Sequence, residues 1–168
     1  KESYELGFDE LNYDYIRYPS DGNMADTSYV NPNKQVALET FFKYLHAHVS
    51  PLGGVTSADL FGMTTVAYDD MGIGQMLEQA LPYFDYIAPM VYPSHFAKNF
   101  NGYADPNKNV YGVIYHSMGE AVKRTEATTT RTSFIGAESI ASTSPLLYKK
   151  PAYPRTKLRP WLQDFSYG

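Results

Sequence analysis

Residues 8–22 read FDELNYDYIRYPSDG, and this stretch decides the fold that we expect for the chain. It has the composition of a strand that runs into a turn, but Glu10, Asn12 and Asp14 interrupt an otherwise apolar run. Because side chains alternate across a strand, these three polar residues share one face, and the intervening residues share the other. Such a polar stripe fits either a solvated antiparallel edge or a site whose chemistry requires carboxylates.

The rest of the chain alternates between strand and helix patterns. The strands predicted after the first one are 55–62, 84–92 and 157–165. The predicted helices run from the cap-and-proline pair Asn31-Pro32 to Pro51, over about 73–81, and from Asp105-Pro106 to about Lys123. Strands that alternate with helices predict an α/β fold with a parallel sheet and right-handed crossovers. Because an eight-stranded TIM barrel needs about 250 residues, these (β/α) units form about half of one.

The length and patterning indicate a single partial-barrel domain over residues 1–168, with 43% hydrophobic content to build its core. Residues 125–156 break the strand and helix rhythm, because they are rich in Thr and Ser and then in Pro. We interpret this range as an inserted loop region, in which 134–141 is the one candidate for a short element.

Composition restricts the partners and the chemistry. Fourteen Lys plus Arg against 18 Asp plus Glu give a net charge of −4, which argues against nucleic acid as a partner. The sequence has no cysteine, so disulfides, thiolate metal sites and cysteine nucleophiles are excluded. No apolar run is long enough for a membrane span, and the residues from Lys1 onward do not have the pattern of a signal peptide. Aromatic residues make up 15% of the chain, and tyrosine-rich clefts suit hydroxylated ligands.

The carboxyl ends of parallel barrel strands supply catalytic groups, and the polar residues of this sequence gather at those ends. The candidates are Asp14 and Arg17 on the first strand, Ser57 and Asp59 on the second, Met90, Tyr92 and His95 on the third, and Trp161, Gln163 and Asp164 on the fourth. We expect Asp14 and Asp59 to face one cavity, because both lie at the carboxyl ends of parallel strands. A carboxylate pair in one cavity suits glycoside hydrolysis. An alternative role for Arg17 is to neutralise Asp14, which would keep that carboxylate ionised near neutral pH.

Strand alternation also separates the aromatic residues. Tyr92 and Trp161 are expected to line the cleft and stack on sugar rings, whereas Tyr15 lies on the face opposite Asp14 and is expected to pack under helices. Glu10, the deepest residue of the polar stripe, should be hydrogen-bonded or paired, because a lone buried charge is costly.

Several motifs together resemble a bacterial family of proposed glycoside hydrolases whose TIM-barrel domain is distantly similar to the α-amylase superfamily. They are GFDELNYDYIRYPSDG, SADLFG, YIAPMVYPSHF, NGYADPN and RPWLQDF. The resemblance implies that the chain holds strands four to seven of the barrel. It places Asp14 at the fourth-strand nucleophile, Asp59 at the fifth-strand acid, and Asp164 or Gln163 near the seventh-strand stabiliser.

This sequence departs from the amylase pattern in two ways: the fifth-strand acid is Asp instead of Glu, and the Arg follows Asp14 instead of preceding it. The resemblance also implies that Arg17, Tyr92, His95, Trp161 and Gln163 bind the substrate, a polysaccharide or oligosaccharide. We expect no cofactor, and an extracellular or cell-envelope location.

Other functions stay open at this point. A non-catalytic carbohydrate-binding barrel, or an inactive fragment of the enzyme, would keep the aromatic cleft without turnover. A metal-dependent hydrolase would use Asp14, Asp59 and His95 as ligands. His46 and His48 do not form a metal pair, because helix positions two apart point in divergent directions. Four strands cannot close a barrel, so the sheet edges should stay open and allow self-association.

Overall fold

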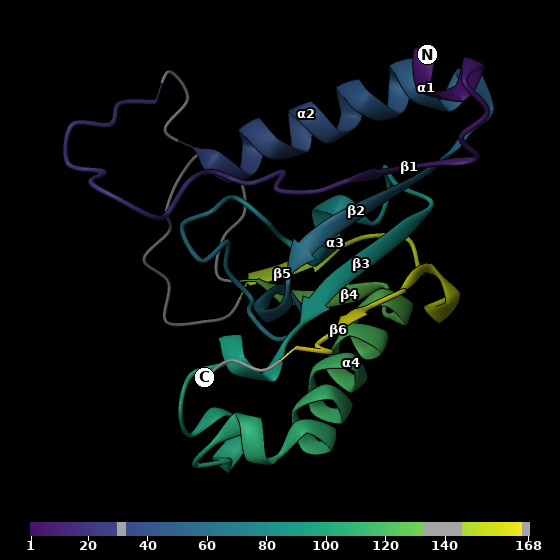
Figure 1. Cartoon of the computed structure of the whole chain (residues 1–168). Helices are drawn as coiled ribbons and strands as arrows, with labels where there is room; N and C mark the ends of the chain where they lie inside the picture. The colour runs from purple at the N-terminus through teal and green to yellow at the C-terminus, as the bar shows by residue number, and fades with distance from the viewer. Residues whose placement is uncertain (30–32, 133–145, 166–168) are drawn as a thin grey trace.

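Four parallel strands form the curled, half-barrel sheet around which the chain is built (Figure 1). The computed structural model describes residues 1–29, 33–132 and 146–165. The strands follow one another in the order β1 (Glu10–Tyr13), β2 (Val55–Phe61), β3 (Tyr86–Val91) and β6 (Trp161–Leu162). The predicted α/β class and the parallel half-barrel sheet are confirmed.

Helices connect the strands. The α-helices are α1 (Glu2–Glu5), α2 (Lys34–Val49), α3 (Leu77–Ala80) and α4 (Val110–Glu126). Short 3₁₀ turns are η1 (Ser50–Leu52), η2 (Gly62–Thr65), η3 (Pro93–His95), η4 (Phe100–Gly102), η5 (Pro106–Lys108) and η6 (Arg155–Lys157). Figure 1 shows α2 running beside β1 and β2, and α4 lying near β6, toward the other edge of the sheet.

The hydrophobic core lies between one face of the sheet and the helices. Leu60 on β2 and Ile87 on β3 are fully buried there, together with Phe42 of α2, Leu77 of α3 and Ala121 of α4. Because strand side chains alternate, the residues between these core positions point to the opposite, inner face of the curled sheet. That inner face carries the polar residues.

The helix starts differ in detail from the prediction. The predicted cap at Asn31 lies outside the described residues, and Asn33 caps α2 by accepting a hydrogen bond from the Val36 N–H at 3.0 Å. Asp105 caps the turn η5 rather than a helix, and α4 begins after it at Val110. In both places an Asn or Asp side chain satisfies a backbone N–H at the start of a helical segment.

The predicted loop region 125–156 contains regular structure at both ends. Helix α4 continues to Glu126, and β4 (Thr129–Thr132) pairs antiparallel with β5 (Leu146–Lys149). The segment 134–141 lies outside the described residues. Lys150 is buried after this pair, and its ammonium group donates to the backbone oxygens of Thr125 and Ala127 at 2.9 and 2.7 Å.

The first and fourth strands are shorter than predicted. Strand β1 ends at Tyr13, and β6 is reduced to Trp161 and Leu162, with one further bridge between Leu158 and Ile87. Pro160 interrupts the fourth segment because proline has no N–H for the strand ladder. Among the described residues, β1 and β6 are the edges of an open sheet.

The backbone turns sharply directly after β1. Tyr15 adopts a left-handed conformation with a φ of 57°, so the strand alternation does not extend to its side chain. The prediction that Tyr15 packs under helices is therefore wrong: its side chain is 64% exposed and lies on the same side as Asp14.

No helix within the described ranges is long and apolar enough to span a membrane.

Candidate active site

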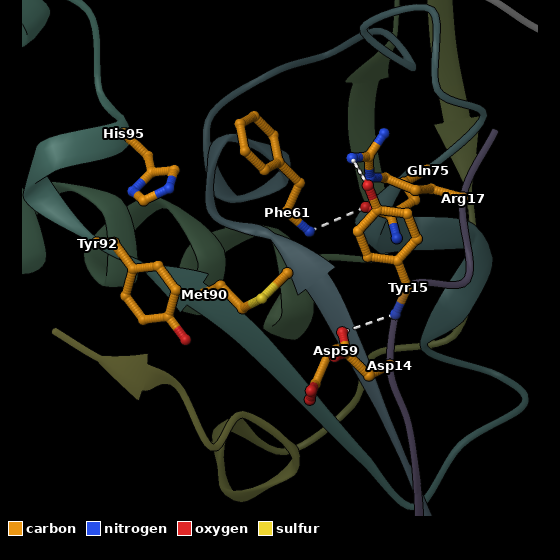
Figure 2. A pocket seen from close by; sticks show the side chains of 9 residues that line it. All are labelled: Asp14, Tyr15, Arg17, Asp59, Phe61, Gln75, Met90, Tyr92 and His95. Atoms are coloured by element: carbon orange, nitrogen blue, oxygen red, sulfur yellow. Dashed lines mark hydrogen bonds between the residues drawn. The ribbon is translucent and has the colours of Figure 1, made fainter. Parts of the chain in front are cut away.

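A cavity of about 230 Å³ opens where β1, β2 and β3 end (Figure 2). It lies at the carboxyl edge of the parallel sheet, where strand ends bring distant residues together. Its walls are formed by Asp14, Tyr15, Arg17, Asp59, Phe61, Gln75, Met90, Tyr92 and His95. Six of the ten strand-end candidates from the sequence thus line one cavity, namely Asp14, Arg17, Asp59, Met90, Tyr92 and His95.

Asp59 points from β2 to the inner face and is only 6% exposed. One carboxylate oxygen, Oδ2, accepts a hydrogen bond from Asn12 Nδ2 at 3.0 Å. The other, Oδ1, accepts one from the indole Nε1 of Trp161 at 2.8 Å. The Ser57 hydroxyl donates in turn to Asn12 Oδ1 at 2.7 Å. Residues from three strands therefore hold this carboxyl group.

Burial raises the pKa of Asp59 above its usual value, and the hydrogen bonds from Trp161 and Asn12 and the charge of Asp14 act on it as well. The two hydrogen bonds lower the pKa, whereas the neighbouring negative charge raises it. Burial also raises the pKa of Tyr92, with smaller contributions from the charges of Asp59 and Asp14. The charge of Asp14 therefore acts on Asp59, and the charges of both carboxylates act on Tyr92.

Asp14 is exposed to solvent one residue beyond the end of β1. Its Oδ1 accepts a hydrogen bond from the backbone N–H of Tyr15 at 2.6 Å, which Figure 2 shows as a dashed line. The tight turn at Tyr15 thus orients the Asp14 carboxylate at the mouth of the cavity.

Arg17 does not contact Asp14 in the way that the sequence suggested. Its guanidinium group donates to the Tyr15 hydroxyl at 2.8 Å and pairs with Asp21 at 3.2 Å. It also lies 4.4 Å from the centre of the Tyr15 ring. The loop that follows Arg17 brings the Asp21 carboxylate to its guanidinium group. Arg17 holds the Tyr15 ring in place at the cavity wall.

Gln75 is a site residue that sequence reasoning missed. Its side chain is buried, accepts a hydrogen bond from the Phe61 N–H at 2.9 Å and donates to the Ile16 carbonyl at 3.1 Å. It therefore ties the end of β2 to the loop after β1. Nothing in the local sequence marks this glutamine, because its partners lie in two other segments.

The fourth-strand candidates occupy different places. Trp161 donates its indole N–H to Asp59, as described above. Gln163 lies outside the cavity wall and accepts hydrogen bonds from the Ser94 N–H and hydroxyl at 3.1 and 2.9 Å, which anchors the loop that carries His95. Asp164 is exposed beyond β6 and does not line the cavity.

A second hollow of about 330 Å³ lies further down the inner face and is lined by Glu10, Asn12, Ser57, Ala88, Arg159, Pro160 and Trp161. Glu10 forms an ion pair there with Arg159, whose guanidinium group lies 3.6 Å from the centre of the Tyr86 ring. Burial acts to raise the pKa of Glu10, but the nearby Ser57 side chain and the hydrogen bond and charge of Arg159 bring it below its usual value. The expected pairing of Glu10 is confirmed.

In the described part of the chain, no three His, Asp or Glu side chains are grouped so that they could hold a metal ion. The proposed metal set of Asp14, Asp59 and His95 is therefore not assembled. His46 and His48 instead contact the backbone oxygens of Tyr83 and Tyr44 through Nδ1, at 3.0 and 2.8 Å.

Comparison with protein-family models matches residues 1–168 to a family described as a "putative glycosyl hydrolase domain". Searches of curated proteins and of solved structures give no significant match.

Proposed function

The chain belongs to the family whose model, described as a "putative glycosyl hydrolase domain", matches residues 1–168. We propose that it cleaves O-glycosidic bonds of a polysaccharide or oligosaccharide with Asp14 and Asp59 as the working pair. On this proposal β1, β2, β3 and β6 take the positions of strands four to seven of a TIM barrel. The site would act on carbohydrate outside the cytoplasm, in the extracellular space or the cell envelope.

One observation carries the proposal: Asp14 and Asp59 line the same cavity from neighbouring strand ends but in different environments. Asp59 is buried and has a raised pKa, which suits a general acid that protonates the leaving oxygen. Asp14 is exposed, which suits a carboxylate that attacks the anomeric carbon or activates water. Different environments for two carboxyl groups are how glycosidases separate these roles.

The remaining cavity wall supports a sugar ligand. Tyr15 and Tyr92 offer ring faces for stacking, and Arg17 and His95 offer polar groups for sugar hydroxyls. This combination of aromatic faces with a few polar groups is typical of clefts that orient a hydroxylated ligand.

The test is to incubate the protein with a panel of bacterial and plant polysaccharides and to measure hydrolysis as the release of reducing ends. We expect Asp14→Asn and Asp59→Asn each to lower kcat by about 10²-fold or more while the folded structure is kept, because the amides cannot attack or transfer a proton. Asp26→Asn, in an exposed loop away from the cavity, is the matched control and should retain turnover.

Binding without turnover would contradict the proposal. If the wild type retards a polysaccharide in affinity electrophoresis but releases no reducing ends from it, the chain is a carbohydrate-binding module. Full activity of Asp14→Asn on a substrate that the wild type cleaves would also exclude the proposed mechanism.

A further inference from the structure

We propose that Asn12 and Trp161 are positioning residues that fix the Asp59 carboxyl group, and that Ser57 acts behind them by orienting Asn12. The inference rests on the proposed function, because it explains how Asp59 is aimed for proton transfer. It also gives Trp161 a role through its indole N–H, where the sequence suggested a ring for stacking on sugars.

The geometry assigns one N–H donor to each carboxylate oxygen of Asp59. Asn12 Nδ2 reaches Oδ2 at 3.0 Å from β1, and Trp161 Nε1 reaches Oδ1 at 2.8 Å from β6. Two hydrogen bonds from opposite sides leave the carboxyl plane little freedom to rotate. Each oxygen keeps a further lone pair, so a proton can still be carried toward the cavity.

Trp161 reaches Asp59 although β3 lies between their strands. The residue opposite Asp59 on β3 is Ala88, and its methyl group leaves room on the inner face for the indole. Both Ala88 and Trp161 line the hollow below the cavity. A small residue at this register position therefore permits the hydrogen bond across the sheet.

Ser57 supports Asn12 from the side away from Asp59. The ionised Asp59 carboxylate only accepts hydrogen bonds, so the amide nitrogen of Asn12 faces it, and the Ser57 hydroxyl donates to the remaining Asn12 Oδ1 at 2.7 Å. A reversed amide would place two oxygen atoms against each other. Ser57 and Asp59 lie two residues apart on the same face of β2, which keeps this arrangement in register.

The effect of the two N–H donors on Asp59 can be distinguished from the effects of the charged groups near it. Asp14 and Tyr92 face it from the neighbouring strand ends, the Glu10–Arg159 pair lies below it, and Arg17 and His95 line the rim of the cavity. Asn12 and Trp161 are uncharged, and each donates an N–H to the Asp59 carboxyl group, so they stabilise its ionised form. Removing either donor should therefore raise the pKa of Asp59.

The main experiment follows the Asp59 side-chain carboxyl carbon by ¹³C NMR during a pH titration, without substrate. Trp161→Phe removes the N–H and keeps an aromatic ring, and because Trp161 is half exposed the fold should tolerate the change. We expect the pKa of Asp59 to rise in Trp161→Phe and in Asn12→Leu, and to rise less in Ser57→Ala. Tyr92→Phe is the matched control, because it removes a polar aromatic group of the same cavity and should leave the Asp59 titration unchanged.

An unchanged Asp59 titration in Trp161→Phe and Asn12→Leu would overturn the inference, and so would an equal shift in Tyr92→Phe. Where a cleaved substrate is in hand, the alkaline limb of kcat/KM should move to higher pH in the two variants, with kcat lowered roughly 10- to 100-fold and KM changed less than about twofold. A stacking role alone for Trp161 would raise KM and leave this limb in place. The titration requires no turnover, so it gives its result even if the proposed hydrolase activity fails.

Discussion

Tyr15 shows how one backbone angle builds part of the site. A φ of 57° is strained for a residue with a Cβ, at a cost of about 1 kcal/mol or more. The strained turn brings the Tyr15 N–H to Asp14 and places the ring beside Arg17. A strain of this kind persists at a residue only when its surroundings hold it, which fits a position at the cavity wall.

Replacing Tyr15 should separate strain from ligand binding. We expect Tyr15→Gly to leave the free energy of unfolding within about 1 kcal/mol of the wild type, because relief of the strained φ offsets the greater chain entropy of glycine when unfolded. Tyr15→Ala keeps the strain and should be less stable than Tyr15→Gly by about 1 kcal/mol in urea denaturation. Both variants lose the ring and should weaken oligosaccharide binding. A large loss of stability in Tyr15→Gly would indicate that the ring packs in a core after all.

Replacing Asp14 should change the pKa of Asp59. The charge of Asp14 contributes to the raised pKa of Asp59, after the larger effect of burial. In Asp14→Asn the like charge is gone, so the pKa of Asp59 should fall relative to the wild type while remaining affected by burial. A ¹³C NMR titration of the Asp59 carboxyl measures the shift. The same titration in Asp164→Asn should match the wild type, because Asp164 lies outside the cavity.

At the scale of elements, a buried ion pair joins the two helices behind the site. Arg124 of α4 donates to both carboxylate oxygens of Glu78 on α3, at 2.7 and 2.6 Å, and to the Thr64 carbonyl of η2 at 2.7 Å. Glu78 is fully buried and Arg124 is 4% exposed. The turn η2 directly follows β2, which carries Asp59, so this pair fixes the carboxyl end of the strand beside the cavity.

Breaking that pair from one side should be costly. We expect Arg124→Met to lower the free energy of unfolding by about 3 to 5 kcal/mol, because it leaves the Glu78 carboxylate buried without a partner. The double variant Arg124→Met with Glu78→Leu should recover part of the loss, since both charges are then absent. Lys123→Met removes a solvent-exposed ion pair with Glu120 on the same helix and should change the urea midpoint little. If Arg124→Met and Lys123→Met lowered the free energy of unfolding equally, the buried pair would contribute no more to stability than an exposed one.

At the scale of the whole molecule, the sheet of the described residues has two open parallel edges, β1 and β6. Unpaired N–H and C=O groups at such edges favour pairing with another chain. The apolar side chains of Trp161 and Leu162 at the β6 edge are half exposed and add to this tendency.

We therefore expect residues 1–168, prepared alone, to associate with rising concentration in sedimentation velocity experiments. Leu162→Lys should reduce the association, because a charged side chain on an edge strand is costly to bury against a second strand. A monodisperse monomer across the whole concentration range would exclude this prediction. Leu162 does not line the cavity, so the substitution changes association without altering the cavity wall.

The sequence by itself determined the architecture and the location of the site. Strand and helix periods are local properties, so the alternation of elements predicted the parallel half-barrel sheet, and the polar stripe from Glu10 to Asp14 predicted its inner face. The rule that parallel strands end at one edge then brought Asp14 and Asp59 to one cavity.

Only the tertiary structure decided how the site residues are connected. The partners of Asp59 lie 47 and 102 residues away along the chain, at Asn12 and Trp161. Gln75 forms hydrogen bonds with two segments that share no local pattern with it. Arg17 pairs with Asp21 because the loop after β1 brings that carboxylate near its guanidinium group. The physical reason is that a hydrogen bond depends on strand order, register and side-chain reach, whereas the periodicity of a sequence records only which face of its own element a residue occupies.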